Sequence, residues 1–138
     1  MSEGSANYLS NFLIRKLIND GVYEKSDNWN HSLRDEMKSR MSQLKDMLAN
    51  CPNFNLSDLN YGNVCDPYTF GMWGIAYILN RAENIDAYQQ IMFPLINDLG
   101  YYGAFEEAFG ITFEAFNQEF LEFLELPIEE QLEIIPDI

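Results

Sequence analysis

The stretch Asp66–Arg81, DPYTFGMWGIAYILNR, decides the fold. It carries no charge between Pro67 and Asn80, and its apolar residues fall on every side of a helical wheel, which is typical of a helix packed on most of its circumference. Asp66 is suited to act as N-cap, and Pro67 suits the first helical position, where a missing N–H does no harm. The stretch therefore predicts a central apolar helix over 67–81.

Two glycines, Gly71 and Gly74, stand inside this helix. Glycine is a poor helix former, so we expect the pair to let the backbone of a neighbouring helix come close. At about fourteen residues the uncharged segment is shorter than the roughly 20 apolar residues that span a bilayer. A membrane span is therefore not expected here.

The composition describes a folded, acidic chain. With 138 residues, 47% of them hydrophobic and 14% aromatic, the sequence is long and apolar enough for one domain with its own core. Its 22 acidic and 8 basic residues give a net charge of -14, which repels phosphate backbones and anionic lipid surfaces. We expect neither nucleic acid nor a membrane as a partner.

Apolar residues at helical spacing predict further helices along the chain. Gly21 is expected to end the first helix, and Cys51-Pro52 the second helix. Pro94 breaks or kinks a later helix, which Gly100 closes. Ser57 could cap a short turn over 57–60. These helices are expected over 5–20, 32–49, 84–99, 103–109, 113–126 and 127–134. No segment alternates with period two over more than a few residues, so the prediction is an all-α fold. We expect one compact domain, 1–138, of about five to seven helices around 67–81.

The first of these helices is apolar over more than half of its circumference. Ala6, Leu9, Leu13 and Leu17 recur at helical spacing, and further apolar residues flank them. The flanking residues are Tyr8 and Phe12 on one side and Ile14 and Ile18 on the other. A terminal helix with one face in solvent needs a narrower stripe, so this helix is expected to pack on two faces.

Residues that could carry chemistry are few. The chain has one histidine, His31, and two cysteines, Cys51 and Cys65, whose spacings match no known zinc-ligand pattern. Reduced thiols are the default expectation for this pair, and a bridge between them stays open. No nucleotide-binding, nucleophile-elbow or H-E-x-x-H motif occurs, so the residues predict no catalytic group and no cofactor.

The opening segment Ser2-Glu3-Gly4-Ser5-Ala6-Asn7-Tyr8-Leu9 resembles the E-G-x-A-x-Y segment of gluzincin-type zinc metallopeptidases, the peptidase MA clan. The stretches Tyr68 to Leu79 and Gly103 to Phe116, followed by Glu119-Phe120, look like the helical region that follows that segment in the same proteins. The order and spacing of these pieces carry the resemblance over nearly the whole chain.

This resemblance implies that Glu3 is the counterpart of the third zinc ligand. In the family the two histidines and the general-base glutamate of H-E-x-x-H precede that glutamate, and here only Met1 and Ser2 do. One carboxylate does not hold a catalytic zinc ion, which keeps three protein ligands. We therefore expect a C-terminal piece of a gluzincin-like protein that is not catalytic by itself, with zinc only in a full-length parent.

In such a peptidase the helix that carries Glu3 packs on the H-E-x-x-H helix, so the apolar arc of Ala6, Leu9, Leu13 and Leu17 loses part of its cover here. Exposed patches of this kind usually find another surface. We expect self-association, most simply a two-fold homodimer through the first helix.

The alternative is a stand-alone helical interaction or scaffold module that binds a partner protein through the same helix. No basic segment followed by an apolar one opens the chain, so the expectation for the chain as given is cytoplasmic. The compartment stays open if the start is incomplete.

Overall fold

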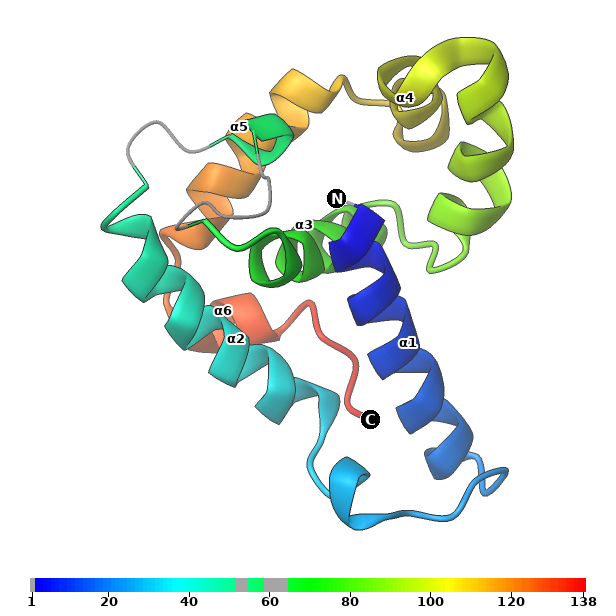
Figure 1. Ribbon diagram of the computed structural model, residues 1–138, viewed down its shortest axis with the longest axis vertical. Coiled ribbons are helices and arrows are strands. Elements are labelled where there is room, and N and C mark those ends of the chain that lie inside the picture. Colours follow the sequence, from blue (N-terminus) through cyan, green and yellow to red (C-terminus); the bar gives the residue numbers. More distant parts are fainter. Residues whose placement is uncertain (1, 52–54, 59–64) are drawn as a thin grey trace. The chain divides into compact units, whose positions relative to one another are not determined.

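The computed structural model describes residues 2–51, 55–58 and 65–138 (Figure 1). Within these residues it has six α-helices and no strand, which confirms the all-α prediction and the expected number of helices. The α-helices are α1 (Ser2–Asn19), α2 (Leu33–Leu48), α3 (Pro67–Arg81), α4 (Phe93–Phe109), α5 (Phe113–Leu124) and α6 (Ile128–Leu132). Three shorter elements are the 3-10 turns η1 (Asp27–Trp29) and η2 (Leu56–Asp58) and the π-helix η3 (Ala87–Met92).

The chain forms two compact units, and the boundary between them falls inside α3. Unit 1 consists of residues 1–75 and 127–138, and unit 2 consists of residues 76–126. Each unit contains its own buried apolar side chains, from Tyr8 to Ile135 in the first and from Ala76 to Leu124 in the second.

The start of α3 is fixed by its N-cap, as the sequence predicts. The Asp66 carboxylate accepts hydrogen bonds from the Thr69 amide at 2.9 Å, the Thr69 hydroxyl at 2.7 Å and the Tyr68 amide at 3.2 Å. Partial burial opposes ionisation of Asp66, but these hydrogen bonds outweigh it and hold its pKa below the usual value. In unit 1, α3 buries Phe70, Met72, Trp73 and Ile75 completely.

The amphipathic helix α2 supplies the other large part of the unit 1 core. Ser32 and Asp35 form a capping box at its start. Its buried residues are Leu33, Met37, Met41 and Leu44. The indole N–H of Trp73 donates to the Met37 carbonyl at 3.2 Å, so a buried polar group joins α3 to α2.

The C-terminal segment packs against α2, and α6 lies beside that helix in Figure 1. The Arg34 guanidinium donates to the Ile135 carbonyl at 2.9 Å, and the Leu33 amide donates to the Ile138 carbonyl at 2.7 Å. The Leu33 bond satisfies a backbone amide in the first turn of α2, where amides have no partner within the helix.

In unit 1, α1 crosses α3 at two glycines. A Cβ atom added to Gly71 would stand 2.8 Å from the Cα atom of Gly4, and one added to Gly4 would collide with the backbone of Gly71 and Met72. The two backbones therefore touch directly, which confirms the close approach predicted at Gly71.

Unit 2 is built on aromatic packing between α3, α4 and α5. Ring centroids of Phe105 and Phe113 are 5.1 Å apart, and those of Tyr77 and Phe123 are 4.8 Å apart. Thr112 caps α5 by accepting from the Ala115 amide at 3.2 Å. Edge-to-face and tilted pairs of this kind add to the burial of the rings.

Several predicted boundaries are wrong. The first helix begins at Ser2 and not at Ser5. By contrast, Pro94 lies in the first turn of α4, directly after the π-helix η3, and Gly100, with a non-helical φ of 70°, separates two helical stretches, which agrees with the predicted break at Pro94 and end at Gly100.

The predicted turn over 57–60 is also placed wrongly. It begins at Leu56, and its cap is Asn55, whose side-chain oxygen accepts from the Ser57 amide at 2.9 Å. Residues 59 and 60 of that prediction lie outside the described residues. The helix predicted over 113–126 ends at Leu124. No helix in the described part of the chain combines the length and the apolar character needed to cross a membrane.

Candidate functional site

The helix α1 has one buried side and one side that is largely accessible. Ser5, Tyr8 and Arg15 are buried, and Gly4 lies against Gly71. Burial raises the pKa of the Tyr8 hydroxyl to about 12. The side of α1 that packs in unit 1 is therefore the Tyr8 flank.

The residues predicted to self-associate lie on α1 but away from that buried side, and we call Ala6, Leu9, Leu13 and Leu17 the α1 stripe. Ala6 is exposed, Leu13 is 54% exposed, and Leu9 and Leu17 are half-buried. The structure thus leaves an apolar surface along α1.

A pocket lies at the C-terminal end of α1. Gly21, with a φ of 74°, ends the helix, and the amide of Val22 returns to the Leu17 carbonyl at 2.8 Å. The pocket has a volume of about 330 Å³ and is lined by Ile14, Ile18, Tyr23, Glu24 and Trp29. We call it the end pocket.

Sequence reasoning did not find the end pocket. The sequence places Ile14 and Ile18 only on one flank of the first helix. The available signal was an aromatic side chain in a loop next to the apolar flank of a helix.

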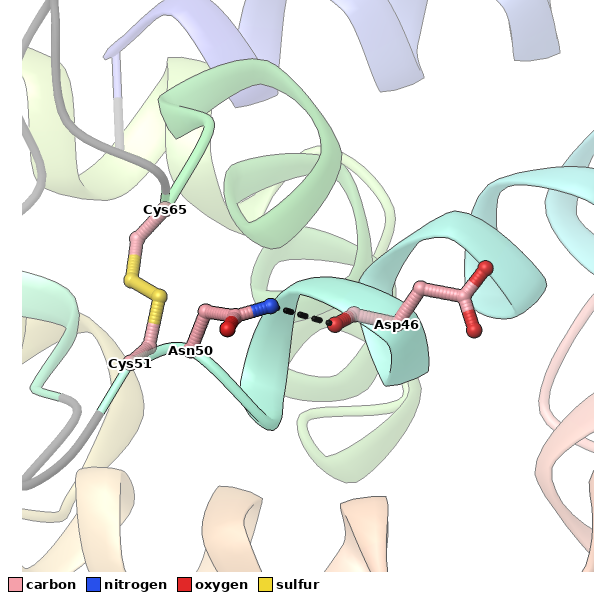
Figure 2. Close-up of a disulfide and its surroundings, with 4 residues drawn as sticks. All are labelled: Asp46, Asn50, Cys51 and Cys65. Atoms are coloured by element: carbon pink, nitrogen blue, oxygen red, sulfur yellow. Dashed lines mark hydrogen bonds between the residues drawn. A yellow bond between two sulfur atoms is a disulfide. The ribbon is translucent and has the colours of Figure 1, made fainter.

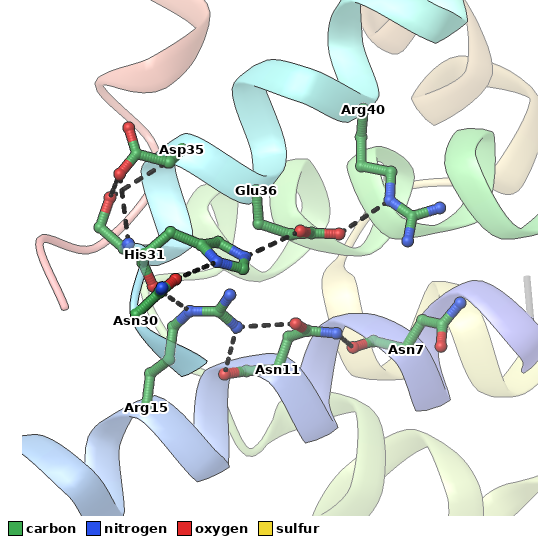
Figure 3. Close-up of polar contacts among 9 residues, drawn as sticks. Asn7, Asn11, Arg15, Asn30, His31, Asp35, Glu36 and Arg40 are labelled. Carbon is green, nitrogen blue, oxygen red and sulfur yellow. Dashed lines mark hydrogen bonds and ion pairs between the residues drawn. The ribbon is translucent and has the colours of Figure 1, made fainter. Parts of the chain in front are cut away.

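A buried arginine holds the loop of Trp29 against α1. The Arg15 guanidinium lies 5.0 Å from the centre of the Trp29 ring. It donates to the Asn11 side-chain oxygen at 2.7 Å and to the His31 carbonyl at 3.1 Å (Figure 3). Burial lowers its pKa from the ordinary value, while the nearby carboxylates of Glu36 and Asp35 act in the opposite direction. Arg15 therefore connects α1 to the loop that precedes α2.

His31 belongs to the same polar network. Its Nε2 atom lies 3.2 Å from one oxygen of Glu36, and the other oxygen accepts from Arg40 at 2.9 Å (Figure 3). Burial opposes ionisation of Glu36, but Arg40 and His31 outweigh it and hold the pKa of Glu36 below its usual value. The single histidine of the chain thus takes part in a network that ties α1 to α2.

Glu3, the counterpart of a zinc ligand by resemblance, lies half-buried in the first turn of α1. Among the residues that the structure describes, no group of three or more His, Cys, Asp or Glu could hold a metal ion. Because a catalytic zinc ion needs three protein ligands, this part of the chain does not fit one.

The two cysteines form a disulfide between the end of α2 and the start of α3 (Figure 2). The Cα atoms of Cys51 and Cys65 are 6.2 Å apart, within the range that a bridge can span. The default expectation of reduced thiols is wrong, and the bridge left open by the sequence is the observed state. Neither sulfur is a thiol that could bind metal or act as a nucleophile.

Comparison of this chain with protein-family models, with curated proteins and with solved structures finds no match.

Proposed function

We propose that this chain is a helical protein-binding module and that the α1 stripe is its contact surface. The observation that carries this proposal is the exposure of Leu13 at 54%, beside the exposed Ala6 and the half-buried Leu9 and Leu17. An apolar face with anchors three and four residues apart is what helix-in-groove recognition uses.

The size of the surface sets the strength of binding. Complete burial of a leucine side chain contributes about 1.5–3 kcal/mol. About half of the Leu13 side chain is already covered, so burial of the exposed half would contribute about 1 kcal/mol. A stable interface buries more than about 1,000 Å² in total, so the contact must extend beyond the stripe. Val22 and Tyr23, 64% and 61% exposed at the end of the same helix, would extend it.

A second copy of the chain is the simplest partner, because a two-fold axis brings the same apolar surface together twice. We expect a weak homodimer that forms in the micromolar range. Sedimentation velocity over a concentration series measures it directly.

The matched variants for this experiment are Leu13→Glu and Leu99→Glu. Leu99 is 49% exposed and lies in unit 2, so it controls for placing a charge at a half-exposed leucine. Leu13→Glu is expected to keep the chain monomeric and Leu99→Glu to leave the dimer intact. A monomer at every concentration, with no partner that loses affinity for Leu13→Glu, would refute the proposal.

Binding rather than catalysis also agrees with where the reactive residue types lie. His31 is tied to Glu36 and Asn30, and the two cysteines are joined to each other. These groups are engaged in holding α1, α2 and α3. We therefore propose no reaction for this chain.

A second proposal concerns origin: the chain is the helical C-terminal part of a gluzincin-like zinc metallopeptidase. It is supported by the resemblance of the segment from Ser2 to Leu9 and by the place of Glu3 in the first turn of a helix. In such a protein the α1 stripe would face the H-E-x-x-H helix, and the remaining zinc ligands would come from that helix.

The coding DNA upstream of Met1 tests this second proposal. An in-frame His-Glu-x-x-His pattern would support it, and the longer chain should then bind one zinc ion and lose affinity for zinc in Glu3→Gln. An in-frame stop codon directly before Met1 would overturn the peptidase origin and leave the binding module as it stands.

We also propose that the chain works in a compartment that oxidises thiols, and not in the cytoplasm as expected from the sequence. The support is the Cys51–Cys65 disulfide, because structural disulfides persist mainly in oxidising compartments. Thiol alkylation in lysates made under acid quench tests it. Two alkylated cysteines in the native chain would contradict it.

A further inference from the structure

We propose that the end pocket binds a small organic cation, an ammonium compound that carries one aromatic or branched aliphatic group. The proposal concerns residues at the end of α1 and does not depend on the α1 stripe being a contact surface. It rests on the size, the lining and the charge of the pocket.

The size and the lining select the apolar part of the ligand. A volume of about 330 Å³ lies at the lower end of the range of about 300–1,000 Å³ that is usual for small-molecule sites. Four of its five lining residues are apolar or aromatic: Ile14, Ile18, Tyr23 and Trp29. An aromatic ring or a branched alkyl group placed against them leaves water and gains hydrophobic free energy.

The charge of the pocket selects the polar part. Glu24 is the one acidic residue among the lining residues, and it is exposed. An ammonium group beside it gains attraction, whereas a carboxylate or a phosphate is repelled. The net charge of -14 acts in the same direction by concentrating cations near the surface.

Arg15 does not reverse this preference. Its guanidinium is not among the groups that line the pocket, and it lies against the Trp29 ring with its N–H groups donated to Asn11 and His31. The carboxylates of Asp35 and Glu36 are also close enough to act on its charge. Arg15 therefore orients Trp29, and the ligand's charge is left to Glu24.

Three probes with the same phenylethyl body separate shape from charge: phenylethylamine is a cation at neutral pH, phenylethanol is neutral and phenylpropanoate is an anion. The two tryptophans of the chain give two indole N–H signals in a proton–nitrogen correlation spectrum. The Trp29 signal should move on titration, and that of the buried Trp73 should stay in place as the internal reference.

For ligands of this size we expect affinities of about millimolar. An ion pair at an exposed carboxylate should make the amine bind about two- to fivefold more tightly than the alcohol. The anion should bind more weakly than the alcohol. A Trp29 signal that does not move, or equal affinities for the three probes, would overturn the proposal.

Two variants locate the preference. Glu24→Gln should remove the advantage of the amine while the alcohol still binds, and Glu107→Gln, at an exposed acid of unit 2, should leave it unchanged. Ile18→Ala should weaken all three probes together, because it removes apolar lining without changing charge. If Glu24→Gln keeps the preference for the amine, the assignment of the charge to Glu24 is wrong and the proposal fails.

Discussion

The crossing of α1 and α3 makes a prediction opposite in sign to the usual effect of replacing a helical glycine. In an exposed helix, alanine is more favourable than glycine by about 1 kcal/mol. At Gly71 the new Cβ atom would stand 2.8 Å from the Gly4 Cα atom and 3.1 Å from its nitrogen. These are backbone atoms, which cannot rotate away, so α1 must move.

The size of the movement sets the cost of Gly71→Ala. The separation has to grow from 2.8 Å to at least 3.4 Å, where ordinary contact begins, so α1 withdraws by about 0.6 Å. A gap of this size already loses about a quarter of the dispersion attraction between the facing atoms, and overpacking of this kind costs about 1–3 kcal/mol. After the gain in helix propensity, we expect the free energy of unfolding to fall by about 1 kcal/mol.

Gly103→Ala is the matched control, because Gly103 also lies inside a helix. Its added Cβ atom would stand 3.1 Å from the Leu99 Cβ atom, a contact that needs a shift of only a few tenths of an ångström and involves no second helix. We expect Gly103→Ala to lower the free energy of unfolding less than Gly71→Ala does. Urea denaturation followed by far-ultraviolet circular dichroism measures both variants. If Gly71→Ala stabilises the protein, or costs no more than Gly103→Ala, the direct contact of the two backbones is refuted.

Three further predictions concern the disulfide and two ionisable groups. Replacing both cysteines by serine should lower the free energy of unfolding by about 3 kcal/mol, the loop-closure value for a sequence separation of 14, and a thiol titration of the unreduced, unfolded chain should find no free thiol. Asp66→Ala should cost about 1 kcal/mol at neutral pH. The pKa of Asp66 is lower in the folded state than in the unfolded state. Its contribution to stability is therefore present above the unfolded-state pKa and is lost as the pH falls through the folded-state pKa. The stability of the variant should consequently fall less steeply at acid pH. The pKa of Tyr8 is raised to about 12, so its contribution to stability is complete below about pH 10 and is lost as the pH rises toward 12. The stability of Tyr8→Phe should therefore fall less steeply at alkaline pH. An unchanged dependence on alkaline pH would count against burial of this hydroxyl.

The sequence by itself determined the helices that carry the fold. Asp66 was recognisable as a cap because it bonds to an amide three residues further along the chain. The helices α2 and α5 followed from a period of 3.6 residues, since neighbours on a helix face are three and four positions apart. The error at Ser57 arose where two nearby polar residues could act as the cap, and in the structure the cap is Asn55.

The tertiary structure decided which side of α1 is buried, which pairs of distant residues meet and where a pocket forms. The apolar arc of α1 is wider than half of the helix, so periodicity alone could not select a side. Gly4 meets Gly71, Cys51 bonds to Cys65, and the end pocket combines a helix, a loop and a 3-10 turn. Each depends on distances between residues that lie on different segments of the chain. Local propensity acts over about one helical turn, and only packing in three dimensions sets these longer distances.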